Sequence, residues 1–140
     1  MRIILDVNII LSALIKDSAV RKVIIESGFE MFFPEISLHK IRKYEDYILR
    51  KSGLKKEDYD KILARLFEYI RLIPNEEILQ NWDKAKEIMG HIDQEDVVFA
   101  ATALSLENSV IWSDDKDFEK QKAIITFKTN DILNYLRFNK

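Results

Sequence analysis

Three acidic segments hold the side chains of this chain that are best suited to chemistry. Asp6 directly follows the apolar run Ile3-Ile4-Leu5, whereas Asp93-Gln94-Glu95-Asp96 and Asp114-Asp115-Lys116-Asp117 lie far along the chain. Carboxylates that are brought together repel one another, and a divalent cation among them relieves that repulsion. A cation held in this way can bind a phosphate oxygen and lower the pKa of a water molecule. If the three segments meet in space, we therefore expect hydrolysis of phosphodiesters.

The residue types restrict which metal and which partners such a site could take. The chain has no Cys and only two histidines, His39 and His91, which excludes thiolate sites and disfavours multi-histidine sites. The remaining oxygen ligands favour Mg²⁺ or Mn²⁺. The net charge of −2 and the pI of about 5.8 predict no broad basic surface. This argues against a protein that coats nucleic acid, and less strongly against an enzyme that holds phosphates through a metal ion.

Length and composition predict one globular domain over residues 1–140. A chain of 140 residues is long enough for a full core, and 47% hydrophobic residues are typical of folded proteins. No apolar run approaches the roughly 20 residues that cross a membrane, and no charged-then-apolar leader opens the chain. We therefore expect a cytoplasmic protein with no membrane partner.

Predicted strands and helices alternate along the chain. Short apolar runs predict strands at residues 2–5, 29–33, 110–112 and 123–127, with a short piece at 72–74. The alternation predicts an α/β fold, in which helices cover both faces of a central, mostly parallel sheet. Residues 34–71 hold two predicted helices and no strand, so we expect a helical pair inserted into this sandwich.

The helices are predicted from apolar periodicity and from their end signals. One helix follows Ser18 and ends at Gly28, and another runs from about 34 to 51. The clearest apolar stripe runs from Tyr59 to Ile70. A helix that Asn75 caps is expected to bury Ile78, Leu79, Trp82, Ala85 and Met89.

The expected topology brings the three acidic segments to one edge of the sheet. Ligands of open α/β sheets bind outside the carboxyl ends of the strands. Asp6 follows the first strand, and the segment from Asp114 follows the strand at 110–112. Asp93 and Asp96 begin the helix that leads back to that strand, and helices in such sheets begin at the carboxyl edge.

Several of these acidic residues also have an explanation that needs no function. Asp93 fits a helix N-cap, and we interpret it mainly in that way. Asp96 adjoins a buried apolar run and is better explained by function. Asp114 fits an N-cap and Asp117 a solvated charge. Asn8 either orients the nearby aspartate or satisfies backbone groups in the turn.

Taken together, the segments resemble the PIN domain, the nuclease fold of VapC-type toxins and of many RNA-processing enzymes. The matching pieces are Ile3-Ile4-Leu5-Asp6-Val7-Asn8 with Ser12-Ala13-Leu14, Asp93-Gln94-Glu95-Asp96-Val97 with Phe99-Ala100-Ala101-Thr102-Ala103, and Ile111-Trp112-Ser113-Asp114-Asp115-Lys116-Asp117-Phe118. The resemblance implies a PIN-like α/β/α sandwich and a metal-dependent ribonuclease. The ligands that it implies for Mg²⁺ or Mn²⁺ are Asp6, Asp96 and Asp115. We expect Asn8, Asp93 and Asp117 to be supporting residues. It also implies an RNA substrate, frequent homodimers and, for a toxin, a small antitoxin protein as partner.

One position departs from the family pattern. The family usually carries a Glu early in the helix after the second strand, and that position falls at Lys40. A lysine there neutralises part of the carboxylate charge and weakens metal binding. Glu45, further along the same predicted helix, substitutes for the missing acid if the helix register differs.

The leading hypothesis is a Mg²⁺- or Mn²⁺-dependent endoribonuclease, as the toxin of a toxin–antitoxin pair or as a processing enzyme. Two alternatives remain open. The first is a non-catalytic PIN-like module that binds RNA or a protein partner, in line with Lys40 and the acidic pI. The second is phosphoryl transfer through an aspartyl-phosphate on Asp6, although Asp6-Val7-Asn8 lacks the second Asp of haloacid-dehalogenase-like proteins.

Overall fold

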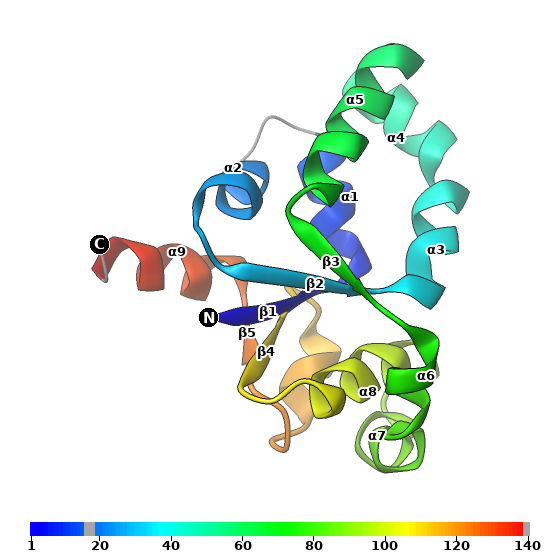
Figure 1. The fold of residues 1–140 in the computed structure, drawn as a ribbon, viewed down its shortest axis with the longest axis vertical. Coiled ribbons are helices and arrows are strands. Elements are labelled where there is room, and N and C mark those ends of the chain that lie inside the picture. Colours follow the sequence, from blue (N-terminus) through cyan, green and yellow to red (C-terminus); the bar gives the residue numbers. More distant parts are fainter. Residues whose placement is uncertain (16–18, 139–140) are drawn as a thin grey trace.

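A parallel sheet of five strands runs through the centre of the molecule (Figure 1). The computed structural model describes residues 1–15 and 19–138, so the predicted cap Ser18 lies outside the described residues. The strands are β1 (Arg2–Leu5), β2 (Glu30–Pro34), β3 (Ile70–Ile73), β4 (Ser109–Trp112) and β5 (Thr126–Phe127). Their order is β3-β2-β1-β4-β5, and every neighbouring pair is parallel. The predicted α/β fold with a central parallel sheet is therefore confirmed.

Helices cover both faces of the sheet, which makes the three layers of the sandwich. On one face lie α1 (Val7–Ile15), α2 (Ala19–Glu26), α3 (Leu38–Lys43), α4 (Glu45–Ser52) and α5 (Lys56–Phe67) (Figure 1). On the other lie α6 (Asn75–Leu79), α7 (Trp82–Met89) and α8 (Val97–Ser105). The last helix, α9 (Thr129–Phe138), follows β5 directly. No helix in the described ranges combines the length and the apolarity that crossing a membrane requires.

Helix α8 is the most deeply buried helix of the second layer, as its sequence predicts. Its first six residues, Val97 to Thr102, are all buried, because α8 packs between α7 and the sheet. The one hydroxyl among them is satisfied inside the helix, where Thr102 Oγ1 donates to the Val98 carbonyl at 2.7 Å. This packing fixes the start of α8, and with it the acidic segment that precedes the helix.

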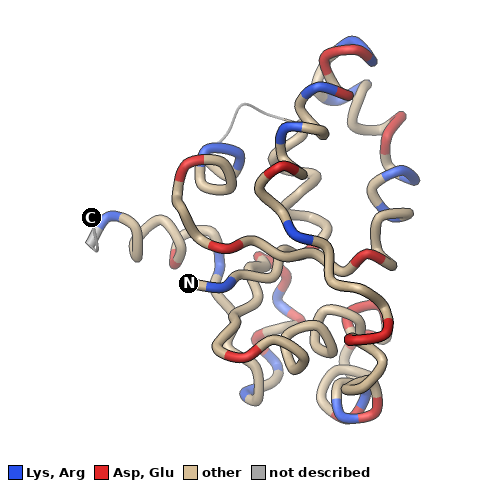
Figure 2. The backbone as a smooth tube through the Cα atoms, in the orientation of Figure 1, with Lys and Arg blue, Asp and Glu red and all other residues tan. Residues whose placement is uncertain are grey.

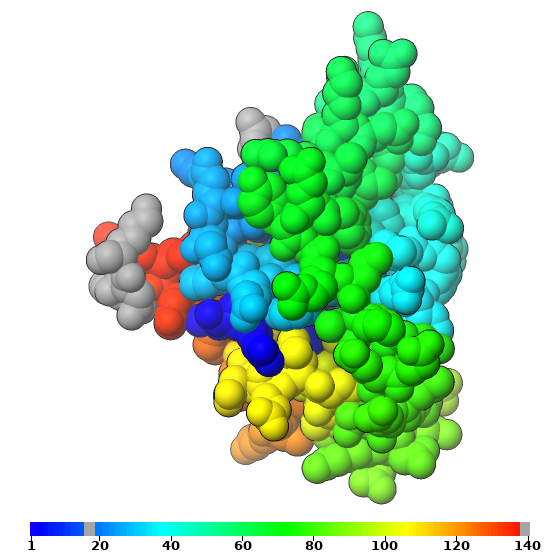
Figure 3. Space-filling model, viewed as in Figure 1, coloured from blue at the N-terminus to red at the C-terminus, as the bar shows by residue number. Residues whose placement is uncertain are grey.

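The inserted helical segment differs from the prediction of one helix over 34–51. After β2 come a 3-10 turn (Glu35–Ser37), then α3, then α4, with the break at Tyr44. Tyr44 has φ −95° and ψ 5°, which interrupts the regular helix, and no Gly or Pro stands at this break. Gly53 ends α4 with φ 70°, a conformation that favours glycine. The α4–α5 end projects beyond the rest of the molecule (Figure 3).

Two other helix predictions need correction. Ile70, predicted at the end of the stripe from Tyr59, belongs to β3. The predicted helix from Asn75 to Met89 is divided into α6 and α7 between Leu79 and Trp82, and Leu79 is 55% exposed rather than buried.

The last strand is shorter than the predicted 123–127, because a side chain takes over part of its backbone bonding. The Gln121 amide donates to the carbonyls of Phe118 and Ile124, at 2.9 and 2.8 Å, and accepts from the Ile124 N–H at 2.8 Å. These bonds hold residues 118–124 as a loop. Regular β5 therefore begins only at Thr126.

Candidate metal centre

The carboxyl edge of the sheet carries the first part of the site. Strands β1 and β4 are adjacent, with Leu5 paired to Trp112. Asp6 and Ser113 follow these two residues directly and are both buried. The Asp6 N–H still donates to the Trp112 carbonyl at 3.1 Å, so the pairing holds the backbone of Asp6 in place.

Ser113 connects the two strand ends through its hydroxyl. Its Oγ donates to Asp6 Oδ2 at 2.7 Å and accepts from the Asp115 N–H at 3.0 Å. One side chain therefore positions both Asp6 and Asp115. Ser113 was not among the predicted site residues; its place between a buried strand and an acidic run was the available signal.

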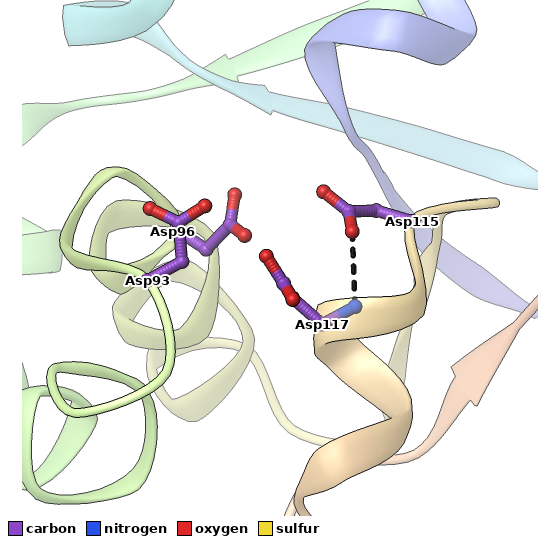
Figure 4. A group of neighbouring side chains, drawn as sticks. All are labelled: Asp93, Asp96, Asp115 and Asp117. Atoms are coloured by element: carbon purple, nitrogen blue, oxygen red, sulfur yellow. Dashed lines mark hydrogen bonds between the residues drawn. The ribbon is translucent and has the colours of Figure 1, made fainter.

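Four carboxylates gather beside this strand end (Figure 4). One oxygen from each lies within 4.8 Å of those of the other three, and the four residues are Asp93, Asp96, Asp115 and Asp117. Two come from the segment that directly precedes α8 and two from the segment after β4, as the predicted topology requires. We call this group the four-aspartate cluster.

Three members of the cluster also make local bonds. Asp93 Oδ1 accepts from the Glu95 N–H at 2.9 Å, so Asp93 caps the 3-10 turn Gln94–Asp96 that precedes α8 rather than α8 itself. Asp115 Oδ1 accepts from the Asp117 N–H at 2.9 Å and caps the 3-10 turn Lys116–Lys120. Asp117 forms an ion pair with Lys120 at 3.1 Å. These bonds fix three of the carboxylates within their own segments.

Asp96 is the member of the cluster that most needs a partner. It is 7% exposed, and its buried Oδ2 has no hydrogen-bond partner among the described residues. Burial raises the pKa of Asp96 to about 7, and the charges of Asp6, Asp93, Asp115 and Asp117 add to this effect. A buried carboxylate oxygen without a donor, within a set of oxygen ligands, fits a hard divalent cation such as Mg²⁺ or Mn²⁺.

Asp6 lies next to the four-aspartate cluster and is electrostatically coupled to it. Burial raises the pKa of Asp6, hydrogen bonds from Ser113 and the Val7 backbone oppose this, and the charge of Asp115 adds to it. The positive charge of Lys40 lowers the pKa of Asp6 slightly. The structure thus brings all three predicted ligands into one acidic region, with two of them inside the cluster and Asp6 beside it.

Other predicted residues lie elsewhere or do other work. Glu45 forms an ion pair with Lys56 of α5 and is not part of the four-aspartate cluster. Asn8 is exposed on α1, and within residues 1–15 and 19–138 no hydrogen bond joins it to Asp6.

Asp114 does not cap the turn that follows it, which corrects the prediction. Its two carboxylate oxygens accept from the N–H and the hydroxyl of Thr129, at 2.8 and 2.6 Å, at the start of α9. Asp115 caps the 3-10 turn instead. Asp114 is thus a structural residue that stands next to a site residue.

The matching family model is described as the PIN domain and covers residues 4–137. Among solved structures, the chain resembles one chain in the crystal structure of VapBC2 from Rickettsia felis bound to a DNA fragment from their promoter. The two share 18% sequence identity with a TM-score of 0.63, over 91% of this chain and 98% of the other. None of the curated proteins compared with the chain matches it.

Proposed function

We propose that this chain, which belongs to the PIN domain family, is an endoribonuclease that depends on Mg²⁺ or Mn²⁺. The observation that carries this proposal is the four-aspartate cluster at the carboxyl edge of the sheet. Its oxygens lie close enough to share one cation, and Asp96 contributes a buried oxygen that has no other partner among the described residues.

Each residue of the site has a distinct part in this proposal. Asp96 and Asp115 hold the cation, and Asp6 completes the set directly or through water. Ser113 orients Asp6 and Asp115, since it bonds to both. Asp93 and Asp117 are the other two members of the four-aspartate cluster and add negative charge to it. Asn8 is exposed on α1, two residues after Asp6, and has at most a secondary role.

The protonation state of Asp96 affects how the site takes up a cation. Because its pKa is raised to about 7, Asp96 holds a proton on part of the molecules at neutral pH. Loading the site with a cation requires that proton to leave, since the ionised oxygen is the ligand. When bound, a divalent cation supplies Lewis acidity, which polarises a phosphoryl oxygen and makes a water easier to deprotonate.

The family and the structural resemblance suggest which molecules this chain binds. We propose RNA as the substrate and, if the chain acts as a toxin in the cytoplasm, a small antitoxin protein as its partner. The Rickettsia felis structure is one of VapBC2 bound to a DNA fragment from their promoter, which motivates this partner. A homodimer is the assembly proposed in solution. Light scattering of the purified chain tests it, and co-purification from the native host tests the partner.

The main alternative is a PIN-like module that binds RNA or a protein without cleaving. Lys40 favours it, because its positive charge acts on Asp6 and competes with a cation. Phosphoryl transfer through Asp6 is less well supported: Asp6 is only 4% exposed, and Ser113 occupies its Oδ2.

The deciding experiment is cleavage of labelled RNA with Mn²⁺ by the wild type and by Asp6→Asn and Asp96→Asn. We expect cleavage by the wild type that EDTA stops and that both substitutions abolish. Cleavage that survives both substitutions would point to a contaminant or another site. Calorimetric titration with Mn²⁺ separates the alternatives, because a module that binds no metal at millimolar concentration is not this nuclease.

A further inference from the structure

One short segment of this acidic protein carries a local excess of positive charge. Residues 38–56 hold seven Lys or Arg and two Asp or Glu, a net charge of +5, although the whole chain carries −2. Lys and Arg recur along α3 and α4 (Figure 2). A local concentration of this kind is a feature of nucleic-acid-binding surfaces, and the overall net charge hides it.

Five side chains of this segment share one side of the α3–α4 pair. They are spaced three or four residues apart, which makes them neighbours on a helical surface. The two helices nearly continue one another, since the Tyr44 N–H donates to the Ile41 carbonyl and the Ile48 N–H to the Tyr44 carbonyl. We call this set the basic–aromatic face; its members are Lys40, Lys43, Tyr44, Tyr47 and Lys51.

Within this face, two lysine–tyrosine pairs follow one another along the helices. Lys43 Nζ lies 5.8 Å from the ring centroid of Tyr44, and Lys51 Nζ lies 5.9 Å from that of Tyr47. The two tyrosine residues are 40% and 44% exposed. Neither lysine has an ion-pair partner in the part of the chain that the structure describes. Both cations can therefore bind phosphates, and the part of each ring that its lysine leaves uncovered can stack on a base.

The face begins at the acidic site and continues beside a hollow. Lys40 Nζ lies 5.7 Å from the ring centroid of Phe99 in α8, and its charge acts on Asp6. Further along, a cavity of about 320 Å³ lies between α1 and α4 and is lined by Asn8, Leu11, Ser12, Ile15 and Tyr47. The polar side chains at its start follow Asp6 along α1. A ligand can thus extend from the four-aspartate cluster over the face.

We propose that the basic–aromatic face is the track along which single-stranded RNA leaves the acidic site. Bases stack on Tyr44 and Tyr47, and Lys43 and Lys51 bind the phosphates between them. Lys40 holds the phosphate nearest to the aspartates. This inference rests on the proposed function, because the strand must end at the site that cleaves it.

The chemistry of the face favours a single strand over other occupants. Bases within a duplex are already stacked and cannot lie on exposed rings. An acidic protein segment would satisfy the lysines, but alternating cations and flat rings at helical spacing match alternating phosphates and bases better. Single-stranded RNA is accordingly the occupant that this face fits best.

The test is binding of a fluorescent, mixed-sequence single-stranded RNA, followed by anisotropy in EDTA so that no cleavage occurs. The face variants are Tyr44→Ala/Tyr47→Ala and Lys43→Gln/Lys51→Gln. The matched control is Lys84→Gln/Lys86→Gln, which removes two exposed lysines from α7, the helix beyond the opposite face of the sheet. All altered side chains are exposed, and circular dichroism checks that each variant folds.

We expect the tyrosine variant to bind RNA about 10-fold more weakly or worse, because each stacked base is lost. The lysine variant should lower the slope of log affinity against log salt by about 1.4, since two phosphate contacts of a single strand disappear. The control should match the wild type in both measurements. A duplex of the same sequence should compete poorly.

The outcomes separate this inference from the nuclease proposal. Wild-type affinity and salt slope in both face variants would overturn the track, even if a protein partner proved to use the same face. A wild type that binds RNA through the face but never cleaves it with Mn²⁺ would contradict the nuclease and leave the track supported. A wild type that cleaves RNA, together with face variants that bind RNA normally, would support the nuclease and contradict the track.

Discussion

Ser113 Oγ donates a hydrogen bond of 2.7 Å to Asp6 Oδ2, between residues 107 positions apart in the sequence. The bond forms because β1 and β4 pair in parallel, so that the residues after Leu5 and Trp112 emerge side by side. Both side chains are buried. A charged oxygen at the end of a core strand is thus satisfied by the neighbouring strand, and the same serine also receives the Asp115 N–H.

Replacing Ser113 with Ala should destabilise the protein by about 1–3 kcal/mol, because a buried carboxylate oxygen loses its donor. The pKa of Asp6 should rise further, since the lost hydrogen bond favoured the ionised form. Urea unfolding measures the first effect. Ser12→Ala, at a half-buried position of α1, is the control and should change stability by less than about 0.5 kcal/mol. Equal stability of the two variants would contradict the role given to Ser113.

The metal-free protein should lose stability as pH rises, in the range where Asp96 ionises in the folded chain. Its pKa lies at about 7 when folded, against 3.8 for an aspartate in an ordinary solvated setting. Between these values the folded chain binds more protons than the unfolded one, so the free energy of unfolding falls as pH increases. This is opposite to the usual behaviour of an aspartate that a cation partner stabilises.

Asp96→Asn isolates this contribution from the other carboxylates. Melting curves in EDTA, recorded from pH 4 to pH 8 for both proteins, give the comparison. The stability of the wild type relative to Asp96→Asn should be highest near pH 4 and should decline towards neutral pH. Parallel pH profiles for the two proteins would show that Asp96 keeps an ordinary pKa.

Mn²⁺ should stabilise the folded chain at neutral pH, because a ligand that binds only the folded state raises the free energy of unfolding. At 100 times the dissociation constant the gain is about 2.7 kcal/mol. Thermal unfolding with Mn²⁺, and again after EDTA, measures it. Asp96→Asn should gain far less, whereas Asp83→Asn, an exposed position on α7, should gain as much as the wild type. A full gain in Asp96→Asn would place the cation elsewhere.

The convergence of the acidic segments could be predicted because strands and helices that alternate along the chain place strand ends and helix starts at one edge of a parallel sheet. A short apolar run is followed by an aspartate twice, directly at Asp6 and, after one serine, at Asp114. Parallel pairing sends both strand ends to one edge. The buried helix α8, with its uniformly apolar sequence, then brings Asp93 and Asp96 to the same place.

Features that depend on contacts between distant residues could not be predicted in this way. The break at Tyr44 has no Gly or Pro beside it. The loop that shortens β5 depends on one side chain, Gln121, which bonds to three backbone groups. The concentration of lysines in residues 38–56 is present in the sequence, but acidic residues elsewhere in the chain outweigh it in the net charge of −2.

Asp114 and Asp115 are neighbours in sequence, and we expect them to respond to substitution in opposite ways. Asp114 accepts two hydrogen bonds from Thr129 and so fixes the start of α9. Asp114→Ala removes both and should cost about 0.5–2 kcal/mol of stability, as for the loss of a helix cap. It should leave Mn²⁺ binding intact, since its carboxylate is not in the four-aspartate cluster.

Asp115→Asn should show the converse. An asparagine keeps an oxygen that can accept the Asp117 N–H, so the turn and the overall stability should be nearly unchanged. It removes one negative charge and one ligand from the cluster, so Mn²⁺ affinity and RNA cleavage should both fall sharply. Urea unfolding and calorimetric Mn²⁺ titration of both variants give the test. Loss of Mn²⁺ binding in Asp114→Ala with stability unchanged would mean that the two residues have exchanged the roles assigned here, because a cap affects folding and a ligand affects the metal.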